Sequence, residues 1–302
     1  MTQARRVRRP RIVLLTVLGS LLSLAAPPPP AAHASHGSHV VQNNWDVWAA
    51  VTGSDGMRIH DVKYKGKTVM NSGITIPQVR VLYPDDHVVY DHFEDQLLFV
   101  GIQKENLGTT GFRLKARYCF SNLIGQPSDC VPSNTTYDYL QRFDFYSDGQ
   151  LWVWLEIHGP GLMNHGGEPT YRIWWRMDFD VTGAGGDYIQ RWNAGTWQQP
   201  SLESYWQDDG NNSPSGYEWR MLDPSPAVHV DPNSVDDALF YGLLFHTGEG
   251  DTNAASEIYP TNYINGEGIQ NTDNVGWYRA DRDHCNNFTV CIPGPRLTLS
   301  NF

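Results

Sequence analysis

Residues 136–149 read TYDYLQRFDFYSDG, and this stretch decides the fold class. Its apolar and aromatic side chains fall on both faces of an extended segment, which is typical of a β-strand buried between two layers. Ser147, Asp148 and Gly149 then indicate a tight turn. A further strand follows at residues 150–157, so the stretch predicts a strand, a turn and a strand.

The rest of the chain repeats this pattern of short strands and turns. We expect strands at residues 46–51, 57–64, 78–82, 150–157, 171–181 and 238–245. The segments LWVWLEI (151–157) and YRIWWRMDF (171–179) are apolar on both faces, which favours strands that lie between two layers. Helix signals are short, and residues 198–232 are the most loop-like. The sequence predicts an all-β protein, a single large antiparallel β-sandwich over residues 45–302.

The first 34 residues have the pattern of an export signal. Arg5, Arg6, Arg8, Arg9 and Arg11 precede an apolar run at 12–26, and Ala32-His33-Ala34 offers a cleavage site. We therefore predict a secreted, extracellular protein that begins with a flexible, histidine-containing segment at 35–44.

Charge and cysteine content narrow the classes of partner. The chain has a net charge of −11, and the basic export signal contains no acidic residue, so the remainder is more acidic still. Nucleic acid and anionic membranes both attract basic surfaces, so we expect neither as a partner after removal of the signal. A small-molecule ligand, an amine among them, suits this charge. The four cysteines form two close pairs, which predict the disulfides Cys119–Cys130 and Cys285–Cys291 in an exported protein.

Six segments, in order, resemble the catalytic β-sandwich of copper amine oxidases. They are VWAAVTGSDGMRIHDVKYKGKTVM (47–70), IPQVRVLYPDD (76–86), TYDYLQRFDFYSDG (136–149), RMDFDV (176–181), NTDNVGWYRADRDH (271–284) and IPGPRLTLSNF (292–302). The resemblance extends over most of the chain after residue 34. It implies the sandwich fold and a homodimer.

The resemblance matches some residues of the copper site and not others. Tyr137 matches the tyrosine that becomes the topaquinone cofactor, and His284 matches the third copper ligand. The other two copper histidines are expected at positions 169 and 171, where this chain has Pro169 and Tyr171. One histidine does not make a useful copper site, because copper in proteins is held by several imidazoles in a fixed geometry. His158 and His165, before Tyr171 in the chain, could rebuild a copper site together with His284.

Two further sets of residues follow from the resemblance. Asp91 and Asp95 are candidates for the aspartate that acts as general base in that family. A structural calcium site is expected from two short motifs: the carboxylates of Asp178, Asp180 and Asp273 and the carbonyls of Phe179 and Asn274. These five oxygen donors are the hard ligands that calcium prefers.

Three functions remain open on these observations. The first is a secreted amine-oxidase-like protein that has lost the standard copper–topaquinone chemistry and binds a ligand, or performs a different reaction, in the old active-site cavity. The second is a primary amine oxidase, which converts an amine to aldehyde, ammonia and hydrogen peroxide, with a rebuilt copper site and a quinone derived from Tyr137. The third is a secreted binding module without catalysis.

Overall fold

The computed structural model describes residues 37–52, 55–91, 93, 98–99, 101–119, 138–158, 169–183, 185–210, 212–233, 238–246, 258–283 and 289–302. The chain divides into the units Met1–Ala32 and His33–Phe302, and all described residues belong to the second. Apart from one turn of 3-10 helix, η3 (Pro260–Tyr263), the described regular elements are strands. No helix in this part of the chain is long and apolar enough to cross a membrane.

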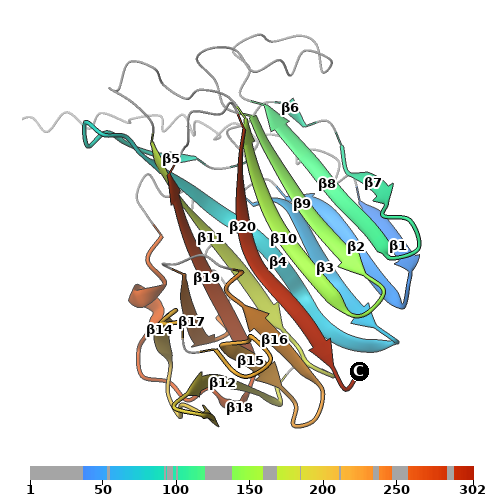
Figure 1. Ribbon diagram of the computed structural model, residues 1–302, viewed down its shortest axis with the longest axis vertical. Helices are drawn as coiled ribbons and strands as arrows, with labels where there is room; N and C mark the ends of the chain where they lie inside the picture. The colour runs from blue at the N-terminus through green and yellow to red at the C-terminus, as the bar shows by residue number, and fades with distance from the viewer. Residues whose placement is uncertain are drawn as a thin grey trace, which may run out of the picture. The chain divides into compact units, whose positions relative to one another are not determined.

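The strands form two antiparallel sheets, which confirms the predicted all-β fold (Figure 1). Sheet A has nine described strands in the order β1-β2-β3-β4-β11-β19-β17-β14, with β5 paired to β4. These strands are β1 (Ser38–Gln42), β2 (Trp45–Thr52), β3 (Gly56–Tyr64), β4 (Lys67–Leu82), β5 (Val88–Asp91), β11 (Thr170–Phe179), β14 (Ser204–Gln207), β17 (Leu239–Leu244) and β19 (Asn274–Asp283).

Sheet B has eleven described strands in the order β13-β12-β15-β16-β20-β10-β9-β8-β6, with β18 paired to β12 and β7 paired to β8. These strands are β6 (Leu98–Phe99), β7 (Gln103–Asn106), β8 (Gly111–Cys119), β9 (Asp138–Tyr146), β10 (Gln150–His158), β12 (Asp187–Asn193), β13 (Thr196–Gln198), β15 (Trp219–Leu222), β16 (Ala227–Asp231), β18 (Gln270–Thr272) and β20 (Thr289–Ser300).

The stretch at residues 136–149 contains β9 and the turn that leads into β10, and the two strands form a hairpin. Along β10 the burial alternates, with the aliphatic side chains in the core and Trp152 and Trp154 half-buried on the other face. The expectation that β10 lies between two layers is wrong, because guanidinium groups cover its tryptophans instead. Arg142 lies 4.8 Å from the Trp154 ring and Arg296 lies 5.4 Å from the Trp152 ring.

Strand β11 is apolar on both faces because both are covered. Trp175 lies in the main core, which fills the space between the sheets. Trp174 points to the other face of sheet A and packs with Trp277 and Tyr241 in a second cluster. The 3-10 turn η3 supplies Tyr263, whose ring centroid lies 6.0 Å from that of Trp277.

Residues 198–232, the most loop-like stretch of the sequence, also contain the short strands β14, β15 and β16, which were not expected. These strands have only four or five residues and lie among turn residues, which hides their alternation in the sequence. Long neighbours fix their pairing: β16 lies along β20 from Ala227, opposite Ser300, to Asp231, opposite Arg296.

Candidate metal centre

Three carboxylates meet where β11 ends and β19 begins. Asp178 and Asp180 are two residues apart, so their side chains project to the same side of the extended chain. Asp273 immediately precedes β19, whose Val275 lies directly opposite Asp178. One carboxylate oxygen from each aspartate lies within 4.8 Å of the others. The structure therefore brings together the three carboxylates that were predicted to hold calcium.

The two residues predicted to offer carbonyl oxygens lie at the same place. Phe179 and Asn274 are opposite each other in the pairing of β11 with β19, and both are buried. The Asn274 side chain donates hydrogen bonds to the carbonyl oxygens of Asp187 (2.9 Å) and Ile269 (3.3 Å). These bonds fix the backbone around the centre. That the two carbonyls bind a metal stays a prediction.

Burial and mutual repulsion favour the protonated form of these carboxyl groups when no cation is bound. Burial, with repulsion from Asp178 and Asp273, raises the pKa of Asp180 to about 7. Burial is also the main reason why the pKa values of Asp178 and Asp273 are raised. Asp187, the first residue of β12, is a fourth acid here: burial raises its pKa to about 8, and Asp180 and Asp273 contribute.

Several oxygens of the cluster lack a donor. Oδ2 of Asp180 accepts a hydrogen bond from the Asn71 amide at 2.9 Å. Oδ1 of Asp273 and Oδ1 of Asp187, by contrast, are buried without a hydrogen-bond partner among the described residues. Buried polar atoms are normally satisfied by protein, water or an ion. Carboxylate oxygens without donors fit a hard cation such as calcium, which would be held by Asp178, Asp180 and Asp273.

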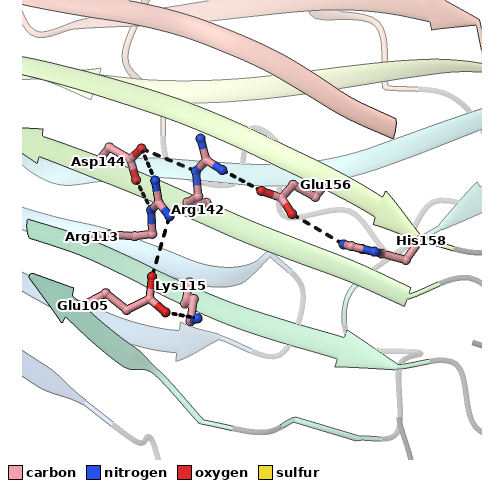
Figure 2. A network of polar contacts seen from close by, with 7 residues as sticks. All are labelled: Glu105, Arg113, Lys115, Arg142, Asp144, Glu156 and His158. Carbon is pink, nitrogen blue, oxygen red and sulfur yellow. Dashed lines mark hydrogen bonds and ion pairs between the residues drawn. The ribbon is translucent and has the colours of Figure 1, made fainter. Parts of the chain in front are cut away.

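The outer face of sheet B shows how this chain normally treats its buried acids (Figure 2). Asp144 is almost fully buried there and receives two hydrogen bonds from Arg113, at 2.6 and 2.9 Å. Arg142 bridges Asp144 (3.4 Å) and Glu156 (2.6 Å), and His158 lies 3.5 Å from Glu156. Both Asp144 and Glu156 are thus paired with guanidinium groups of the protein itself. At the carboxylate cluster, Arg176 is the recurring basic neighbour, and it lowers the pKa of Asp178 and Asp273 only partly.

A hollow of about 220 Å³ lies beside one carboxylate of the cluster. Asp180 lines it, together with polar side chains that include Asp61, Lys63 and Asn71. Of the three predicted calcium ligands in the described part of the chain, Asp180 is the one that lines this hollow.

Asp91, a candidate general base, lies at a different place. It ends β5, is buried, and accepts a hydrogen bond from the hydroxyl of Tyr139. This bond joins the two sheets, because β5 belongs to sheet A and β9 to sheet B. Phe93 packs edge-on against Tyr139, with ring centroids 5.9 Å apart. Asp91 therefore lies beside the strand that follows Tyr137.

Strand ends gather near Asp91 and Tyr139. In sheet A, Thr170 of β11 lies opposite both Leu82 and Asp283, the last residues of β4 and β19. In sheet B, His158 at the end of β10 lies opposite Asp138, the first residue of β9. In Figure 1 these ends lie toward the top. The strands that flank residues 120–137, 159–168 and 284–288 thus end on one side of the sandwich.

The two positions expected to hold copper histidines are both buried. Pro169 is buried, and Tyr171 is fully buried within the main cluster. Tyr171 lies opposite Val81 on β4 and Arg282 on β19. The residues present here do not fit a copper site with three histidines.

Several predicted residues cannot be placed. Tyr137, Asp95, His165, His284, Cys130 and Cys285 lie outside the described residues, as does the side chain of Cys119. Cys291 is an exposed, free thiol in the described part of the chain. Both disulfides stay predictions.

The structure adds two residues that the sequence did not single out. Tyr139 has no motif of its own, and its hydrogen bond to Asp91 crosses between the sheets. Asp187 follows a glycine-rich turn, also without a motif of its own, and only the folded chain brings its side chain to the Val181 amide, next to Asp180. Its one signal is its position seven residues after an Asp-x-Asp.

No family model matches this sequence, and no curated protein matches it. Solved structures do. The Pichia pastoris lysyl oxidase matches with a TM-score of 0.57 at 13% identity over 96% of this chain and 56% of that one. A copper-containing benzylamine oxidase from Hansenula polymorpha matches with a TM-score of 0.52 at 10% identity, over 91% and 63% of the two chains. An Aspergillus nidulans amine oxidase gives 0.50 at 13% identity, over 94% and 55%. This chain thus spans little more than half the length of these enzymes, and what it shares with them is a distant amine-oxidase-like fold.

Proposed function

We propose that this chain is an exported amine-oxidase-like β-sandwich that has lost the standard copper–topaquinone chemistry. It acts by binding a small ligand, or by a different reaction, at the side of the sandwich where the strands next to Tyr137 end. A calcium ion held by Asp178, Asp180 and Asp273 stabilises the scaffold. The observation that carries the proposal is the pair Pro169 and Tyr171 at the positions expected for two copper histidines.

Both substitutions remove metal ligands rather than exchange them. Proline offers no side-chain donor, and the Tyr171 side chain is fully buried within the main core cluster. A neutral imidazole is the ligand that copper needs here, and neither residue supplies one. A copper site would therefore have to be assembled from histidines on other segments.

One observation favours the second candidate, a working primary amine oxidase. Asp91 is a buried carboxyl group beside the strand that follows Tyr137, which is where a general base for chemistry at that tyrosine would be useful. The same position suits a binding site for an amine, because a buried carboxylate attracts a cation. The polar pair Asp91–Tyr139 is thus compatible with both functions, whereas Pro169 and Tyr171 favour the first.

The experiment is a visible spectrum of the exported form, expressed with copper in air, before and after phenylhydrazine. We expect no absorption band that responds to phenylhydrazine, and no difference from a Tyr137→Phe variant treated in the same way. Copper content and amine-dependent peroxide release are measured on the same samples, with an active copper amine oxidase as positive control. A hydrazine-sensitive band that is lost in Tyr137→Phe, with stoichiometric copper, would overturn the proposal in favour of the oxidase.

A further inference from the structure

The charge around the carboxylate cluster exceeds what the three predicted ligands account for. Asp187 is completely buried, and hydrogen bonds join it to the residue that follows Asp180 and to the residue that follows Asp273. Its Oδ2 accepts a hydrogen bond from the Val181 amide at 3.3 Å, whereas its Oδ1 has no hydrogen-bond partner in the described part of the chain. A buried carboxyl oxygen without a donor, next to the two segments that carry Asp180 and Asp273, points to a positive charge in addition to that of Arg176.

The backbone holds Asp187 in this place. Its carbonyl oxygen accepts a hydrogen bond from the Asn274 side chain, which ties the start of β12 to the residue after Asp273. The turn that leads from Asp180 to Asp187 includes Thr182 at a φ of 67°, a left-handed conformation that β-branched residues rarely adopt. The fold thus brings Asp187 to the cluster at the expense of a strained turn.

We infer that Asp187 is the fourth carboxylate of the cation centre, a positioning residue whose charge strengthens the binding of a highly charged ion held by Asp178, Asp180 and Asp273. This inference rests on the proposed calcium centre and adds to it a residue outside both of its sequence motifs. Asp187 acts through charge and through the orientation of its neighbours. Loss of such a residue next to a metal typically lowers affinity by about 10- to 100-fold.

A loss of charge at position 187 changes the affinities for Ca²⁺ and Tb³⁺ by different factors, whereas a loss of packing does not. The Coulomb energy between Asp187 and the ion is proportional to the charge of the ion. If Asp187→Asn weakens Ca²⁺ binding by about 10-fold, the same loss acting on Tb³⁺ is about 30-fold, because the exponent rises from two to three. A variant that only loosens the site would weaken both ions by a similar factor.

The experiment is calorimetric titration of the whole exported chain with calcium chloride and with terbium chloride. Asp187→Asn keeps the size of the side chain and an oxygen that accepts from the Val181 amide, and removes the charge. Glu218→Gln is the matched control, since it makes the same change at another fully buried carboxyl group outside the cluster. Asp178→Asn removes a predicted ligand.

We expect Asp187→Asn to lower Ca²⁺ affinity by about 10- to 100-fold and Tb³⁺ affinity by a larger factor, with both affinities unchanged in Glu218→Gln. Unchanged or equally reduced affinities in Asp187→Asn would overturn the role of Asp187. If Asp178→Asn abolishes binding at the same time, the calcium centre itself stands. A wild-type chain that binds neither ion refutes the centre and this inference together. If Asp187→Asn does not fold without an added ion, Asp187→Ser is used in its place. The Ca²⁺ and Tb³⁺ concentrations at which Asp187→Ser folds are then compared with those for the wild type.

Discussion

Glu218 provides a test of the electrostatics that does not depend on any ligand. It precedes β15 and is fully buried, with Oε1 at 3.3 Å from the Arg191 guanidinium. Burial, reinforced by the adjacent Asp208, raises the pKa of Glu218 from 4.5 to about 9. Folding therefore keeps this carboxyl group protonated at neutral pH, whereas the unfolded chain releases the proton.

The sign of the effect on stability follows from linkage. A carboxyl group whose pKa is raised by folding contributes stability that is fully present below its unfolded pKa and is lost as the pH rises toward its folded pKa. Each pH unit within that window corresponds to about 1.4 kcal/mol. Between pH 5 and pH 8, Glu218 thus lowers the free energy of unfolding by about 4 kcal/mol.

Glu218→Gln removes this loss. Glutamine keeps an acceptor for Arg191 and a donor for Asp208, and it carries no proton to release. We expect the variant and wild type to be similar in stability at pH 5, and the variant to be more stable by about 4 kcal/mol at pH 8. Urea denaturation at pH 5, 6.5 and 8 measures this difference.

The partly exposed Glu105 supplies the control. Its pKa is lowered by the hydrogen bond from Lys115, so it is ionised in both states above pH 5, and Glu105→Gln should follow the wild-type pH dependence. A constant difference between Glu218→Gln and wild type from pH 5 to pH 8 would refute the reasoning, because it would show that Glu218 does not take up a proton on folding.

Three other predictions follow from the structure. Calcium at 100 times its dissociation constant should raise the free energy of unfolding by about 2.7 kcal/mol, and Asp178→Asn should abolish that gain in thermal melts with and without a chelator. Gly73→Ala should destabilise by at least about 3 kcal/mol in urea titrations, because a Cβ there would lie 1.5 Å from a carbonyl oxygen of β3, whereas Gly66→Ala has the same φ of 80° with nothing within 4 Å. Asp144→Asn should cost about 3 kcal/mol or more, since it breaks a buried pair with two arginines, and the exposed Asp148→Asn should leave the melting temperature unchanged.

The sequence predicts most of the central strands because their patterns are local. The apolar runs of β10 and β11 are visible within ten residues, and both strands lie where they were expected. The residues that cover the outward face of a strand come from other parts of the chain. The Trp152 and Trp154 side chains are shielded by Arg296 and Arg142, which come from β20 and β9, and sequence alone does not reveal that pairing.

The same distinction holds for the site. Asp178 and Asp180 form a short motif, and the resemblance placed Asp273 with them across nearly a hundred residues of chain. Asp187 and the Asp91–Tyr139 bond have no motif, and each depends on contacts between strands that are far apart in the sequence or in different sheets. A carboxyl group that is buried only by tertiary contacts cannot be told from a surface aspartate in a turn.

The cation centre and the altered copper positions are separated by the length of one strand. Asp178 is near the end of β11 and Tyr171 near its start, and at about 3.3 Å per residue their Cα atoms are about 23 Å apart. At this separation the carboxylates do not contact the two positions expected for copper histidines, so the proposed calcium centre would serve the junction of β11 and β19 and not the copper chemistry. The proposed loss of the copper histidines therefore imposes no change on the carboxylates, so the proposed calcium centre does not depend on the copper site. It also follows that calcium binding, once measured, would support the fold and its stability but would not favour oxidase activity over ligand binding. Only the phenylhydrazine spectrum distinguishes those two.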